Sequence, residues 1–177
     1  MNFEYPTYIV LELPNEMSDK VMSIRKSHKD VFRSALPVEI TVVGSSGVGT
    51  ISKGQDEQAV FSKVNDIAKK IKPFKLSFKE VKRFPGTDIF VLKVKDERKI
   101  REIHESFKTS GIRLDEISSE FEPHCTLRSR SPITQEDEEK LLNITLEDEF
   151  VVDTLSVYML NKLPIKQLYS VKLTGSL

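Results

Sequence analysis

The sequence predicts a mixed α+β domain, and three observations indicate this class. Short apolar stretches with strand periodicity alternate along the chain with longer stretches whose apolar residues recur at helical spacing. Turn residues at 85–88 separate two strand-like stretches, which is typical of an antiparallel hairpin. A length of 177 residues without a linker suits one domain or two small lobes that share a core, so we expect residues 1–177 to form a single domain.

The predicted elements follow the order β-α-β-α-β-β-α-β-α-β-β. Apolar alternation and strand-forming residues predict strands over residues 8–13, 36–43, 74–83, 89–95, 121–128, 150–160 and 168–173. Helical spacing of the apolar residues predicts helices over residues 18–34, 56–71, 96–109 and 134–142. Thr134 and Asp137 resemble a capping pair at the start of the last helix.

Composition limits the partners and the compartment. Lys plus Arg and Asp plus Glu both number 27, so the chain lacks the basic excess of a protein that grips long nucleic acid. A small phosphoester or a nucleic-acid end is the better expectation. The single cysteine, Cys125, excludes an internal disulfide and fits a reducing compartment. Nothing near Met1 resembles a signal peptide and no apolar run approaches membrane-spanning length, so we expect a cytoplasmic protein without a membrane partner.

Residues 120–130 carry the clearest chemical signal. In an extended strand, the side chains of His124, Thr126, Arg128 and Arg130 share one face, and Cys125 points to the other. An imidazole, a hydroxyl and guanidiniums together suit the binding of a phosphate and the transfer of a proton near it. Because Cys125 and His124 point apart, we expect a buried structural cysteine rather than a thiolate nucleophile.

A second stretch, residues 36–43, repeats this pattern in the N-terminal half. After a proline, both stretches read polar residue, apolar residue, threonine, apolar residue, although Val38 separates Pro37 from Glu39 in the first. Two such strands resemble the Pro-His-hydrophobic-Thr-hydrophobic motifs of the 2H phosphoesterase family. That family includes the bacterial 2'-5' RNA ligase and cyclic phosphodiesterases. The second motif is intact at His124 and Thr126. In the first motif Thr41 is present, but Glu39 stands where the family has its other histidine.

The resemblance implies the fold, the chemistry and the site. It implies two pseudo-symmetric α+β lobes of antiparallel sheet, with helices on the outer faces and a motif strand of each lobe lining a central groove. It also implies chemistry without a metal or a cofactor on 2',3'-cyclic or 2'-5' phosphodiesters of nucleotides or RNA ends. His124 would be a catalytic acid or base, and Thr41 and Thr126 would bind the phosphate.

Glu39 leaves two alternatives open. Burial and a neighbouring phosphate could raise the pKa of this carboxyl until it serves as a general acid or base in place of the missing histidine. Otherwise Glu39 marks a loss or a redirection of catalysis. The other histidines, His28 and His104, lie in the apolar stripes of predicted helices and are expected at the edge of the core, each with a hydrogen-bond partner.

The two arginines after Thr126 are assigned from strand periodicity alone. Arg128 could neutralise charge on the substrate, or it could be an ordinary solvent-facing arginine. For Arg130 the solvent-facing alternative is the stronger one.

The glycine-rich segment after the first motif offers a rival interpretation. Residues 44–49 follow an apolar strand and are similar to the phosphate-binding loop of P-loop nucleotide hydrolases, G-x-x-x-x-G-K-[ST]. However, Thr50 occupies the lysine position and Ile51 the metal-ligating hydroxyl position, and the next helix starts late. A mobile loop beside the groove is the simpler expectation.

Three hypotheses about function follow. The first is a phosphoesterase or RNA-end-processing enzyme that uses His124, Glu39, Thr41, Thr126 and Arg128. The second is a catalytically inactive relative that binds a nucleotide or an RNA end. The third is a P-loop-like nucleotide binder that uses Gly44 to Gly49.

Overall fold

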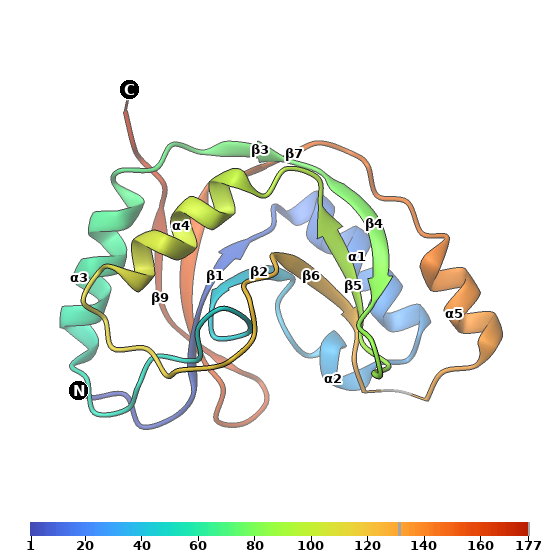
Figure 1. The fold of residues 1–177 in the computed structure, drawn as a ribbon, viewed down its shortest axis with the longest axis horizontal. Helices are drawn as coiled ribbons and strands as arrows, with labels where there is room; N and C mark the ends of the chain where they lie inside the picture. The colour runs from blue at the N-terminus through green and yellow to red at the C-terminus, as the bar shows by residue number, and fades with distance from the viewer. Residues whose placement is uncertain (131, 177) are drawn as a thin grey trace.

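A computed structural model describes residues 1–130 and 132–176 and contains two antiparallel sheets and a short two-stranded ribbon (Figure 1). The four-stranded sheet has the order β2-β1-β8-β9, formed by β1 (Thr7–Glu12), β2 (Glu39–Val43), β8 (Thr154–Met159) and β9 (Lys166–Lys172). The three-stranded sheet has the order β4-β5-β6, formed by β4 (Phe78–Arg83), β5 (Phe90–Val94) and β6 (His124–Arg128). The ribbon pairs β3 (Phe74–Leu76) with β7 (Phe150–Val152).

Each sheet has its own helices. The helices are α1 (Asn15–Ser27), α2 (Val31–Ser34), α3 (Glu57–Ala68), α4 (Arg98–Lys108) and α5 (Gln135–Leu142). In the first lobe, α3 contacts β9 and α4 contacts β2, and in the second lobe, α1 and α2 contact β6 while α5 contacts β4 (Figure 1). The α+β class and the two antiparallel lobes predicted from the sequence are therefore confirmed.

The chain crosses repeatedly between the lobes. Helix α1 follows β1 in sequence but packs against β6 of the other sheet, and α4 follows β5 but packs against β2. Strands β2 and β6 are edge strands of their sheets and lie next to each other. The two strands that carry the motifs therefore meet at the junction between the lobes.

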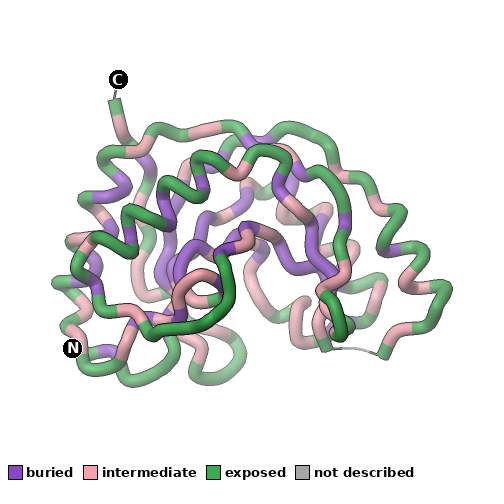
Figure 2. The backbone as a smooth tube through the Cα atoms, in the orientation of Figure 1, coloured by how far each residue is buried: buried purple, intermediate pink, exposed green. Residues whose placement is uncertain are grey.

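The core lies between the sheets and these helices, and the buried parts of the backbone concentrate in the central strands (Figure 2). Strand β1 is the mostly apolar strand that the sequence predicts, and its Ile9 and Leu11 are fully buried on the helix side. On the same strand, Tyr8 and Glu12 are only partly buried. The face of β1 that carries them is therefore available to line a site.

One predicted helix is two. The apolar spacing over residues 18–34 predicted a continuous helix, but α1 ends at Ser27 and α2 begins at Val31. Between them Lys29 adopts a positive φ of 54°, and the Asp30 carboxylate accepts a hydrogen bond from the Arg33 amide at 2.8 Å. This N-cap starts a new turn in another direction.

Two predicted strands are also divided. Residues 74–83 form β3 and β4, and residues 150–160 form β7 and β8, so in each case one piece joins the ribbon and the other joins a sheet. Periodicity alone does not show that a strand changes its partner. The start of α3 after Asp56 and the capping box of Thr134 and Asp137 are confirmed. Among the described residues, no helix has the length and the apolar character needed to cross a membrane.

Candidate active site at the junction of the lobes

A cavity of about 300 Å³ lies where β2 and β6 meet. His124 and Thr126 from β6 line it together with Glu39 and Thr41 from β2. Both motifs contribute alternate residues of a strand, so each polar pair points the same way. The structure therefore brings four of the five predicted site residues into one cavity.

The imidazole of His124 is held in a defined tautomer. Its Nδ1 lies 2.6 Å from the carbonyl oxygen of Glu122, and because a carbonyl only accepts hydrogen bonds, Nδ1 carries the proton. In the neutral imidazole, Nε2 then has the free lone pair. Burial lowers the pKa of His124, against the opposing effect of the Glu122 hydrogen bond, and the ring packs edge-on against Phe84 at 5.2 Å between centroids. His124 is thus suited to accept a proton.

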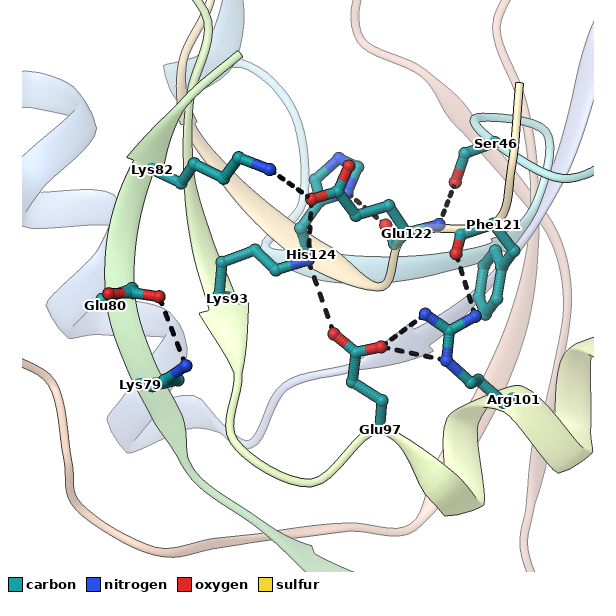
Figure 3. A network of polar contacts seen from close by, with 10 residues as sticks. All are labelled: Ser46, Lys79, Glu80, Lys82, Lys93, Glu97, Arg101, Phe121, Glu122 and His124. Atoms are coloured by element: carbon teal, nitrogen blue, oxygen red, sulfur yellow. Dashed lines mark hydrogen bonds and ion pairs between the residues drawn. The ribbon is translucent and has the colours of Figure 1, made fainter.

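A polar network behind His124 fixes the carbonyl to which it is bonded (Figure 3). The Glu122 amide donates to Oγ of Ser46 at 3.0 Å. The Glu122 carboxylate accepts from Nζ of Lys82 at 3.1 Å and from Nζ of Lys93 at 2.8 Å, so strands β4 and β5 both hold this residue. The orientation of the imidazole depends on this arrangement.

Glu39 and Thr41 lie side by side on the edge strand β2. Oγ1 of Thr41 donates to Oε2 of Glu39 at 2.9 Å. Burial raises the pKa of the Glu39 carboxyl above its usual value, while the Thr41 hydroxyl and the guanidiniums of Arg33 and Arg25 oppose this rise. Glu39 therefore keeps its proton to a higher pH than an exposed glutamate does.

Arg25, which the sequence motifs did not single out, ties the two motif strands together. Its fully buried guanidinium donates from Nε and Nη2 to the carbonyl of Thr126 at 3.1 and 2.8 Å. Nη1 donates at 3.0 to 3.1 Å to the carbonyls of Arg33, Leu36 and Pro37, which lead into β2. One side chain of α1 therefore fixes the position of β6 relative to the start of β2.

A signal for Arg25 was present in the sequence. It lies four residues after Val21 and eight after Met17, and all three are buried on one face of α1. A charged residue on an apolar stripe requires buried hydrogen-bond acceptors. The sequence pattern therefore already indicated that Arg25 binds acceptors inside the protein.

The prediction that Arg128 shares the face of His124 and Thr126 is wrong. Thr126 pairs with Val91, but Arg128 pairs with Phe90, so a bulge in β6 separates the two residues. An extra residue reverses the alternation, and Arg128 points to the opposite face. There it is buried and donates from Nη1 to the carbonyl of Asp88 at 2.9 Å.

Two other arginines line the cavity instead. Arg130 was expected to be an ordinary solvent-facing residue, and it is exposed, but its side chain forms part of the cavity wall. Arg33 also lines the cavity and was missed because it was assigned to a continuous helix. Tyr8 and Tyr158 of the four-stranded sheet and Ser45 also belong to the polar part of the lining.

The glycine-rich segment does not have the loop-to-helix geometry of a P-loop, although Gly44 and Ser45 line the cavity. The amides of Gly47 and Gly49 donate to the carbonyls of Ser119 and Asp115 at 3.0 and 2.7 Å. Because these amides are already bonded and α3 starts only at Glu57, the segment cannot present a helix N-terminus to a phosphate. The P-loop alternative is therefore wrong, and the bonds anchor a segment that we expected to be mobile.

The remaining candidates have structural roles. His104 is buried, its Nδ1 lies 2.7 Å from the carbonyl oxygen of Val42, and its ring stacks on Phe121 at 3.7 Å. Burial raises the pKa of Cys125 to about 11, as expected for a structural cysteine. Within residues 1–130 and 132–176, no group of three or more His, Cys, Asp or Glu side chains is placed to hold a metal ion.

Comparisons with known proteins agree with this fold. Residues 13–162 match the family model of the 2'-5' RNA ligase superfamily. The fold is similar to that of TT0787 of Thermus thermophilus, with a TM-score of 0.70, 15% identity and coverage of 97% of this chain and 99% of that chain.

Two further solved structures share the fold. E. coli LigT complexed with phosphate has a TM-score of 0.62 at 14% identity, with 96% and 98% of the two chains covered. Usb1 of Kluyveromyces marxianus has a TM-score of 0.51 at 7% identity, with 93% and 99% covered. A search of curated protein sequences gave no match. Because the family model covers most of the chain, the protein belongs to the 2'-5' RNA ligase superfamily, and it is a 2H phosphoesterase family member.

Proposed function

We propose that this protein acts on 2',3'-cyclic or 2'-5' phosphodiesters of nucleotides or RNA ends, with Glu39 in place of one family histidine. The observation that carries the proposal is that His124 and Glu39, each followed two residues later by a threonine, line one cavity from opposite lobes. That E. coli LigT, of the same fold, has been crystallised with phosphate supports a phosphate position in such a cavity.

The protonation states favour a division of roles. Neutral His124 offers the lone pair of Nε2 and takes a proton from the attacking water. Glu39, whose pKa burial raises, in its protonated form gives a proton to the oxygen that leaves phosphorus. After the reaction, His124 holds the proton of the water and Glu39 is ionised, so one proton passes between them through solvent before the next turnover.

The threonines bind the non-bridging oxygens of the phosphate in this scheme. Thr126 donates its hydroxyl directly. The hydroxyl of Thr41 is 2.9 Å from Oε2 of Glu39, and when Glu39 is protonated Thr41 can accept from the acid and turn its own proton toward the phosphate. Protonation of Glu39 and phosphate binding by Thr41 are therefore coupled.

A catalytically inactive binding protein is the second candidate. The hydrogen bond between Thr41 and Glu39 favours this candidate. An ionised Glu39 accepts the proton of the Thr41 hydroxyl, which then cannot bind the phosphate, and places a negative charge near it. In that case the cavity would hold a nucleotide or an RNA end without cleaving it.

Hydrolysis of a 2',3'-cyclic nucleotide by the wild type, His124→Ala, Glu39→His and Arg98→Ala separates these candidates. Arg98 is exposed and outside the cavity, and it serves as the matched control. The enzyme hypothesis expects turnover by the wild type and by Arg98→Ala, and a roughly 10²- to 10⁴-fold loss in His124→Ala.

Two other results change the conclusion. An inert wild type that binds the cyclic nucleotide by calorimetry, together with activity gained in Glu39→His, supports the binding protein. A wild type that neither cleaves nor binds any cyclic or 2'-5' phosphodiester rejects both candidates.

A further inference from the structure

Two guanidiniums share one aromatic ring at the cavity. The Cζ atom of Arg130 lies 3.6 Å from the centroid of the Phe32 ring, and Cζ of Arg33 lies 5.7 Å from the same centroid. All three side chains line the cavity that holds His124 and Glu39. The two arginines on the Phe32 ring therefore place two positive charges beside the proposed reaction centre.

Asp30 holds this arrangement in place through main-chain hydrogen bonds. The buried carboxylate of Asp30 accepts hydrogen bonds from the backbone amides of Arg33, Ser129 and Arg130 at 2.8, 2.6 and 3.1 Å. These bonds join the end of β6 to the start of α2, which places the two arginines on either side of the same junction. The oxygens of Asp30 accept hydrogen bonds from main-chain amides and so position both arginines, and the Asp30 charge also acts on the Arg33 guanidinium.

The two guanidiniums are not used by the fold in the same way. Arg33 is half-buried and donates from Nε to Oγ of Ser129 at 2.8 Å. Burial lowers the pKa of its guanidinium, and the nearby Glu39 carboxylate opposes this lowering. Arg130 is exposed and its guanidinium has the Phe32 ring as its partner. Over the described ranges, no carboxylate lies within ion-pair distance of either guanidinium.

We propose that Arg130, with Arg33 beside it, binds a second phosphate group of the substrate. This inference rests on the proposed function and narrows it: the reacting phosphodiester occupies the position between His124 and Glu39, and another phosphate occupies the position at Phe32. An arginine fork matches the oxygens of a phosphate, and two adjacent forks favour a group with more than one charged oxygen.

The size of the cavity restricts the form of that substrate. A volume of about 300 Å³ is at the small end of ligand sites and suits one nucleotide unit inside the cavity. The substrate class is therefore a nucleotide or an RNA end that carries a phosphate in addition to the phosphodiester that reacts.

Three substrates and three proteins test the inference. The substrates are a nucleoside 2',3'-cyclic phosphate, the same compound with a 5'-phosphate, and a dinucleotide that ends in the cyclic phosphate. The first lacks a second phosphate, the second carries it as a monoester and the third as a diester, so the two sources of the group are compared directly. The proteins are the wild type, Arg130→Gln and the control Arg98→Gln, each checked for folding by thermal unfolding.

The inference expects kcat/KM of the wild type to be roughly tenfold to a hundredfold higher for at least one substrate with a second phosphate. In Arg130→Gln, kcat/KM for the substrate with a second phosphate divided by kcat/KM for the substrate without it falls to about 1, because a charge-assisted contact is lost. In Arg98→Gln this ratio keeps its wild-type value. If cleavage is absent, dissociation constants replace kcat/KM in the same ratios.

Equal values for all three substrates in the wild type overturn the inference and leave the proposed function intact. So does a loss in Arg130→Gln that is the same for all substrates, because Arg130 would then bind the reacting phosphate. If no substrate is bound or cleaved, the proposed function and this inference fall together.

Discussion

The hydroxyl of Thr41 donates a hydrogen bond to the carboxyl group of Glu39, and both side chains belong to the motif strand β2. A phosphate-binding group and a proton-carrying group are therefore linked directly on one strand. The protonation of Glu39 decides whether the Thr41 hydroxyl is free for a ligand. The pKa of Glu39 is therefore the central quantity to measure.

Replacement of Glu39 by Gln is expected to change how stability depends on pH. Because the pKa of Glu39 is raised in the folded protein above its ordinary value of 4.5, the folded state binds more protons than the unfolded state between the two values. The free energy of unfolding of the wild type therefore falls as pH rises through this window, and Glu39→Gln lacks this component. Urea unfolding at a series of pH values measures it.

The control for this experiment is Glu80→Gln, since Glu80 is an exposed glutamate on β4. Parallel stability curves for the wild type and Glu39→Gln across the whole acidic and neutral range would show that Glu39 titrates like a free carboxyl. Such curves would also contradict the assignment of Glu39 as the general acid.

The pH profile of catalysis should reveal the environment of His124. Burial lowers its pKa below 6.5, and nearby Lys93 lowers it further, so the acidic limb of kcat/KM should lie below the ordinary histidine value. In Lys93→Met that limb should move to higher pH, because a positive charge has been removed. The exposed Lys75→Met variant is the control and should leave the limb in place. A limb unmoved by Lys93→Met would mean that another group governs it.

Loss of the Arg25 guanidinium should destabilise the protein strongly. Arg25→Met leaves buried carbonyls without donors, at a cost of about 3 kcal/mol or more in the free energy of unfolding. Arg25→Lys should recover only part of this, since a single ammonium cannot reproduce the planar fork that reaches both motifs. Urea denaturation measures both variants against Arg98→Met. A cost of Arg25→Met below that of the surface control would show that the carbonyls find other donors.

Cys125 should be unreactive in the folded protein. Its side chain is fully buried and burial raises its pKa to about 11, so the thiolate is scarce and inaccessible at neutral pH. Labelling with a thiol reagent should be slow in buffer and immediate in denaturant, as mass spectrometry of quenched samples would record. Rapid labelling without denaturant would contradict the burial of β6.

Most of the fold and part of the site follow from local patterns. Alternation and helical spacing located the strands and helices, and the repeated motif pointed to His124, Thr126, Thr41 and Glu39 before any contact was known. These four side chains reach one cavity because a strand in regular pairing fixes the direction of every second side chain.

The failures occurred where distant parts of the chain decide the outcome. Arg128 was misplaced because a bulge depends on how β6 pairs with β5. Arg33 was missed because the break at Lys29 depends on a carboxylate that also binds residues 129 and 130. Arg25 was missed because one of its acceptors, the Thr126 carbonyl, lies about a hundred residues further along the sequence. The position of each of these residues depends on contacts with distant parts of the chain, which no short stretch of sequence contains.

The crossing of α1 and α4 between the lobes has a consequence for dissection of this protein. The sheet that contains β2 draws strands from both ends of the chain and a helix from its middle, and the sheet that contains β6 is covered by helices from both sides of the sequence. Since the segments of the two lobes interleave, one proteolytic cut at a central loop leaves each fragment with pieces of both. Neither half of the sequence therefore contains a complete lobe, and separately expressed halves should restore the cavity only when the two fragments are mixed and fold together.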